Sequence, residues 1–154
     1  MESHIELFKT NIGLELEKVN RTDLEILIKQ LFSQYYFNWD FRYLFRDNLV
    51  NHFSADKSMS NKLNQLTQLR FNKIKEEALV GRDVGIFDFK DNELEELSEI
   101  IFLVADNWFA LSSRKYPGKD EDFLTQRGMG LLIKVSEPYQ SKESKKIFKN
   151  TSVD

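Results

Sequence analysis

Apolar residues recur every three or four positions along most of this chain, and that spacing is typical of helices that bury one face. From Leu24 to Phe45 no glycine or proline interrupts it. The 154 residues include only six glycines and two prolines, so the chain has few places to turn. These features favour an all-α domain of about six helices over a sandwich or a barrel.

Capping signals separate the predicted helices. The first is expected over 4–19, and a Thr22–Glu25 capping box opens the second, which runs to about residue 53. Ser58 or Ser60 is expected to cap a long helix that stops near Gly81, before a loop over 81–89. The last two helices are expected to start at the caps Asp91 and Asp120 and to end at the Pro-Gly and Glu-Pro pairs of 117–118 and 137–138. Residues 141–154 are polar and lysine-rich, which favours a disordered tail.

Aromatic residues crowd the segment from Tyr35 to Phe45. They alternate with other residues as in a strand, but the helical spacing upstream and the lack of a second alternating run favour a helix. On a helix they form two stripes, which are Phe37, Phe41 and Phe45, and Tyr35, Trp39 and Tyr43. A helix with two apolar sides either buries both or lines a cavity, and the sequence leaves open which stripe faces a cavity.

The composition excludes several classes of function. The chain has no cysteine, which rules out disulfides and thiol chemistry. Its two histidines, His4 and His52, lack partners at metal-ligand spacing, so we expect no metal and no cofactor. Phosphate-binding loops and nucleophile motifs are absent, so we expect no enzyme. A net charge of −3 gives no basic footprint for nucleic acid, and without an apolar span or a signal-peptide core the expected location is the cytoplasm.

Two features of the last predicted helices are unusual. Asp106 and Asn107 precede Trp108 in strongly apolar surroundings, and polar groups that become buried need partners or orient a ligand. Gly128 and Gly130 interrupt an otherwise strong helix, at a cost of roughly 1 kcal/mol each relative to alanine. Either another helix packs closely there, or the helix is kinked at this turn.

Three segments resemble the C-terminal, effector-binding domain of TetR-family transcriptional regulators. Residues 41–47 read Phe-Arg-Tyr-Leu-Phe-Arg-Asp, which is similar to a segment of the subgroup with an aromatic pocket helix. Residues 93–110, which end around a tryptophan, and residues 127–139, with an Arg-Gly start and a Pro-Tyr end, resemble the last two helices of the family. The likeness covers about residues 5–139 and rests on the order and spacing of the three motifs.

The resemblance implies an effector-binding and dimerisation domain over residues 1–140, in which helices surround a small-molecule cavity. The effector is expected to be largely apolar or aromatic, and the last two helices are expected to form a four-helix bundle with a second copy. The predicted ligand-binding residues are Tyr35, Trp39, Tyr43, Phe71, Asn107 and Trp108. The predicted dimer-interface residues are Ile101, Val104, Gly128, Gly130, Leu131 and Ile133.

One feature departs from the family pattern. The family places a helix-turn-helix domain before this region, and no such segment with a basic recognition helix precedes His4. The expected partners are therefore a second copy and an effector, with DNA bound only through a helix-turn-helix domain not present in this chain, and no membrane. The alternative is a stand-alone helical small-molecule-binding protein without DNA-binding activity. An enzyme using the same cavity is disfavoured, because only Asp40, Asp106 and the tyrosines could titrate there.

Overall fold

The computed structural model describes residues 56–151, and within this range the regular structure is helical throughout. The α-helices are α4 (Lys57–Asp83), α5 (Leu94–Lys115), α6 (Glu121–Ser136) and α7 (Lys142–Thr151). Two single-turn 3₁₀ helices, η3 (Asp91–Glu93) and η4 (Glu137–Tyr139), precede α5 and follow α6. The predicted all-α class is confirmed. The helices expected over 4–19 and 22–53 lie outside the described residues.

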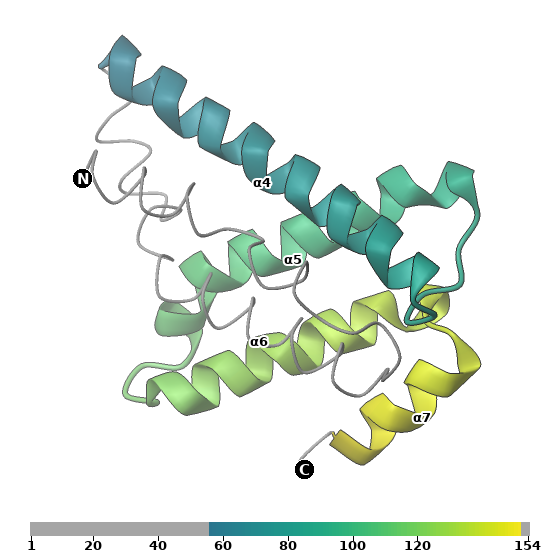
Figure 1. Ribbon diagram of the computed structural model, residues 1–154. Helices are drawn as coiled ribbons and strands as arrows, with labels where there is room; N and C mark the ends of the chain where they lie inside the picture. Colours follow the sequence, from purple (N-terminus) through teal and green to yellow (C-terminus); the bar gives the residue numbers. More distant parts are fainter. Residues whose placement is uncertain (1–55, 152–154) are drawn as a thin grey trace.

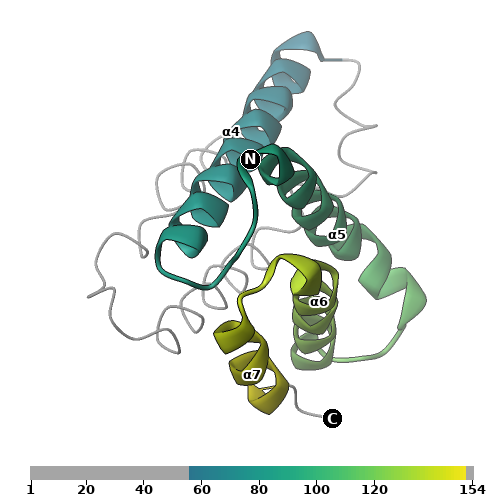
Figure 2. The same ribbon diagram turned by 90° about the vertical axis from the view of Figure 1, so that its right-hand side faces the viewer.

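Helices that follow one another in the sequence pack against each other. α5 and α6 form an antiparallel hairpin, α4 lies across α5, and α7 turns back beside the C-terminal end of α6 (Figures 1 and 2). The hairpin is tied together by Trp108 of α5, which packs on Leu124 of α6. A second core cluster joins α4 to α5 and η4 through Ala78, Leu97 and Tyr139. Burying apolar side chains at these contacts supplies the main driving force for the packing.

The observed caps confirm one prediction and correct two. Asp120 caps α6 as predicted, and its carboxylate accepts a hydrogen bond of 2.8 Å from the Phe123 amide. α4 is capped by Asp56 and by neither predicted serine, because the helix begins earlier and the Asp56 carboxylate accepts from the Ser58 and Met59 amides. Asp91 is not the cap of α5. It begins η3, in which the Glu93 carboxylate accepts from the Lys90 amide at 2.6 Å.

The end of α4 lies two residues beyond Gly81, near which the sequence predicted it. The helix continues through Gly81 to Asp83, and the chain turns at Gly85, whose φ of 87° suits glycine. The Phe87 ring lies against Gly81, and the amides of Ile86 and Phe87 donate to the Gly81 carbonyl at 2.7 and 3.1 Å. The small residue therefore leaves room for the Phe87 ring, and its carbonyl takes part in the C-terminal cap of α4.

The predicted disordered tail is wrong for residues 142–151, which form α7. Four lysines dominate its composition, but Ser144 and Phe148 lie one turn apart and are buried. Phe148 packs on Ile86 in the loop after α4, and Ile147 lies partly buried beside them. A single apolar edge is enough for a short helix when another part of the fold covers it.

Candidate functional site

A partly buried ion pair links α4 to α5. Arg70 is only 2% exposed, and its guanidinium donates to the carboxylate of Asp106. The guanidinium carbon also lies 5.6 Å from the centre of the Phe102 ring, which places a cation against an aromatic face. Asp106 is a polar residue in apolar surroundings in the sequence, and Arg70 is the partner that its partial burial requires.

Glu77 lies two turns after Arg70 on the same face of α4. Burial raises the pKa of its carboxyl to about 7, against the opposing charges of Lys73 and Arg70. Burial also raises the pKa of Asp106, and Arg70 opposes this through its charge and its hydrogen bond. This face of α4 therefore carries charged groups that are partly withdrawn from water, which is the kind of group that fixes the orientation of a bound molecule.

Phe71, a predicted ligand-binding residue, is half-buried on the next face of α4. Its ring meets Phe102 edge-on, with centroids 5.7 Å apart and planes at 82°. The ammonium of Lys75 lies 4.9 Å from the Phe71 ring centre and forms an ion pair with Glu95 of α5. Phe71 thus belongs to the contact between α4 and α5.

The other two described ligand-binding predictions lie in different surroundings. Trp108 is buried, and its indole N–H donates to the Leu124 carbonyl at 2.8 Å, which ties α5 to α6. Asn107 is exposed, and its side-chain amide donates to the Leu103 carbonyl one turn earlier at 2.7 Å. Neither Trp108 nor Asn107 takes part in the ring contact between Phe71 and Phe102. Tyr35, Trp39 and Tyr43 lie outside the described residues, so the ligand site as a whole stays a prediction.

The predicted dimer-interface residues are spread over two sides of the α5–α6 hairpin. Ile101, Leu131 and Ile133 are half-buried, and each packs on a different core cluster. Val104 is half-buried and Gly128 is buried. Gly130 is exposed, and a methyl group added there would meet open space within this chain. Among these six residues Gly130 alone lies on the open surface of the chain.

Three exposed apolar side chains on this hairpin were not among the predicted site residues. Leu103 is 58% exposed, Leu111 48% and Phe123 36%. Leu103 and Leu111 are eight residues apart, so they lie on one face of α5, with Asn107 between them. Phe123 and Gly130 are seven apart and share one face of α6. The helical spacing was visible in the sequence, but α5 is apolar over such a wide arc that spacing alone did not separate its outer face from its inner one.

Residues 56–151 contain no group of three or more metal-ligating side chains that could hold a metal ion.

Among the helices that the structure describes, none combines the length and the apolar character needed to cross a membrane.

Comparison with known proteins identifies the family. The sequence model of the TetR family, described as a bacterial transcriptional repressor, matches residues 9–148. This range contains all three segments, 41–47, 93–110 and 127–139, in which the resemblance was noted. A search of curated proteins and a search of solved structures gave no significant match. Because the family model covers most of the sequence, the chain belongs to the TetR family of bacterial transcriptional repressors.

Proposed function

We propose that this chain is the effector-sensing, homodimerising part of a TetR-type transcriptional regulator. Family membership makes it a regulator of transcription. The observation that carries the finer proposal is the outer face of the α5–α6 hairpin, which leaves Leu103, Leu111 and Phe123 in contact with water. Large apolar side chains that stay exposed on neighbouring helices are the kind of surface that a protein–protein contact covers.

The proposed partner at this face is a second copy of the chain. Two antiparallel hairpins that pack face to face make a four-helix bundle, and a two-fold axis lets the same patch serve both copies. The open space at Gly130 would let the facing helix approach α6 closely. Val104 and Leu131, which are half-buried within the chain, would lose their remaining exposure in such a dimer.

The proposed effector is small and largely apolar or aromatic, with one or two polar groups. Support comes from the aromatic content of the chain and from the withdrawn charges of Arg70, Asp106 and Glu77 beside the α4–α5 contact. An effector that binds one arrangement of α4 and α5 more tightly would shift the population toward it. The mechanism is binding rather than catalysis, and a regulator of transcription would carry it out in the cytoplasm.

Sedimentation equilibrium tests the dimer directly. The unchanged chain should be dimeric at micromolar concentration, whereas Leu103→Glu combined with Leu111→Glu should be monomeric with the same helical circular dichroism. Charges buried in a dimer without partners weaken it strongly, on the order of a hundredfold or more in Kd. Ser113→Glu, an exposed position elsewhere on α5, is the matched control and should remain dimeric. A monomeric unchanged chain at these concentrations would contradict the proposal.

A further inference from the structure

The end of α4, the loop after it, η4 and the start of α7 meet in one junction. The Asp88 amide donates to the Tyr139 carbonyl at 2.8 Å, and the Ser141 amide donates to the Ile86 carbonyl at 2.9 Å. These two bonds flank an isolated antiparallel bridge between Phe87 and Gln140. The loop after α4 is therefore paired with the segment that leads into α7, although the two are far apart in sequence.

α7 adds its own contacts to this junction. The Ser144 hydroxyl, which is buried, donates to the same Ile86 carbonyl at 2.6 Å. Phe148, one turn later, is buried against the Ile86 side chain. The exposed side of α7 carries Lys142, Lys146 and Lys149, and, after the hydrogen bond and charge of Lys134, the charge of Lys149 is among those that lower the pKa of Glu137 in η4. The contact of α7 with the loop is therefore centred on Ser144 and Phe148, which lie one above the other on its inner face, with Ile147 packed beside them.

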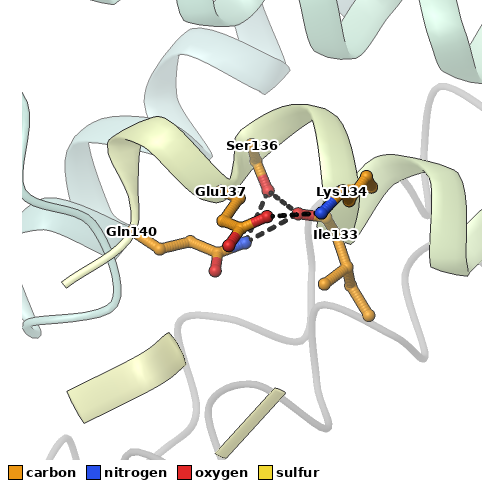
Figure 3. A network of polar contacts seen from close by, with 5 residues as sticks. All are labelled: Ile133, Lys134, Ser136, Glu137 and Gln140. Atoms are coloured by element: carbon orange, nitrogen blue, oxygen red, sulfur yellow. Dashed lines mark hydrogen bonds and ion pairs between the residues drawn. The ribbon is translucent and has the colours of Figure 1, made fainter. Parts of the chain in front are cut away.

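The same segment is anchored to the end of α6. Gln140 lies beneath the last turn of α6, where its side-chain amide donates to the Ile133 carbonyl at 2.8 Å and to the Ser136 hydroxyl at 3.0 Å (Figure 3). The neighbouring Lys134–Glu137 pair closes the turn at 2.9 Å. The Ile133 carbonyl lies in the last turn of α6, where a helix end leaves carbonyls without a backbone partner. The start of α7 is therefore fixed relative to the α5–α6 hairpin, and the loop after α4 is fixed relative to α7.

On its other side the loop packs on the last turns of α4. The Phe87 ring fills the space over Gly81, and the guanidinium of Arg82 lies 4.8 Å from the centre of the Phe89 ring. Arg82 also bridges to Asp91 at 2.7 Å, across the loop. The last turn of α4 is thus held in part by a loop that α7 and the end of α6 fix in place, one turn beyond the direct contact of Ala78 with Leu97 and Tyr139.

We propose that α7 is a conformational strap, which clamps the C-terminal end of α4 when docked and frees it when released. A ten-residue helix is marginal in water by itself, so we expect folding and docking of α7 to be one event with two states. Release would loosen loop 84–90 and the last turn of α4 while the α5–α6 hairpin stays packed. That release alters effector response through Arg70 of the same helix is a consequence that rests on the proposed function.

Amide hydrogen exchange on the full chain, with Phe148→Ala as the variant, tests the strap. Exchange should accelerate by on the order of tenfold or more at Asp88, at Ser141 and at Val84, the residue after α4 whose amide donates to the Val80 carbonyl. Amides in the middle of α5 and α6, such as Trp108 and Met129, should keep their rates. Lys146→Ala, on the outer side of α7, is the matched control and should leave every one of these rates unchanged.

Two outcomes would overturn the strap. Faster exchange confined to residues 142–151 would show that α7 is only appended to the fold, and equal acceleration throughout α5 and α6 would show a general loss of stability. If Phe148→Ala does not fold, Ser144→Ala, which removes one hydroxyl, decides between the same outcomes. The measurement needs neither an effector nor a dimer, so its failure is distinct from failure of the proposed function.

Discussion

At the scale of single residues, Glu77 should make folding depend on pH. Its pKa is about 7 in the folded chain and near 4.5 in the unfolded chain, so the folded state favours the neutral carboxyl. The resulting stabilisation is complete below about pH 4.5 and is lost as the pH rises through about 7. Glu77→Gln should therefore gain stability relative to the unchanged chain between pH 5 and pH 8, by ~1–3 kcal/mol for this half-buried group.

Urea unfolding of both proteins at the two pH values measures this difference. Glu76→Gln is the matched control, because Glu76 is the exposed neighbour of Glu77 and its replacement should have a much smaller effect. An equal difference in unfolding free energy between Glu77→Gln and the unchanged chain at both pH values would contradict the assignment.

The Arg70–Asp106 pair shows how far sequence reasoning reaches at this scale. Asp106 stood out because a carboxylate in apolar surroundings needs a partner. Its partner is 36 residues away in the chain, so no local spacing identified it. Arg70 occupies the position four after Leu66 and four before Ile74, within the apolar stripe of α4. A basic residue inside an apolar stripe predicts that it forms a buried ion pair. It does not identify the acidic partner.

At the scale of elements, Gly81 should respond to substitution against the usual trend. Alanine normally stabilises a helix by about 1 kcal/mol relative to glycine. Here the added carbon would lie 2.7 and 2.9 Å from two atoms of the Phe87 ring, which is held between two core clusters. We expect Gly81→Ala to lower the free energy of unfolding by about 1–2 kcal/mol.

Chemical denaturation of Gly81→Ala alone and combined with Phe87→Leu measures this effect. In the Phe87→Leu background the smaller side chain leaves room, so the same glycine replacement should be neutral or stabilising. Similar destabilisation in both backgrounds would assign the cost to something other than the ring.

Helix boundaries were predictable where the signal was local. Asp120 and the Pro-Gly pair before it marked the start of α6 through residues only a few positions apart. α7 was missed because its single apolar edge, at Phe148, is covered by Ile86, which lies far away in sequence. The amino-acid composition shows that α7 is rich in lysine. It does not show which part of the fold covers the other side of the helix. The same limit applies to α5, where apolar residues on both sides hid the outward direction of Leu103 and Leu111.

At the scale of the whole molecule, a substitution at Gly130 should affect the stability of one chain and that of the proposed dimer differently. Within the chain its surroundings are open, so a larger residue in this helix should leave folding unchanged or improve it. In the proposed dimer a facing helix would approach this point closely, and a larger side chain would hold the two copies apart. Gly130→Leu should therefore raise the dimer Kd by on the order of tenfold while helical circular dichroism is kept.

The comparison that decides this is sedimentation equilibrium of Gly130→Leu beside Ser113→Leu. The second variant adds the same side chain at an exposed position of α5 outside the face shared by Leu103 and Leu111, and it should remain as dimeric as the unchanged chain. Dimerisation that is unchanged by Gly130→Leu but abolished by charges at Leu103 and Leu111 would shift the contact onto α5 alone. Weaker dimerisation in both leucine variants would mean that the contact is not limited to this face of the hairpin. If α5 and α6 both take part, dimerisation should weaken in Gly130→Leu and not in Ser113→Leu, because two crossing hairpins would leave no room for a side chain at Gly130.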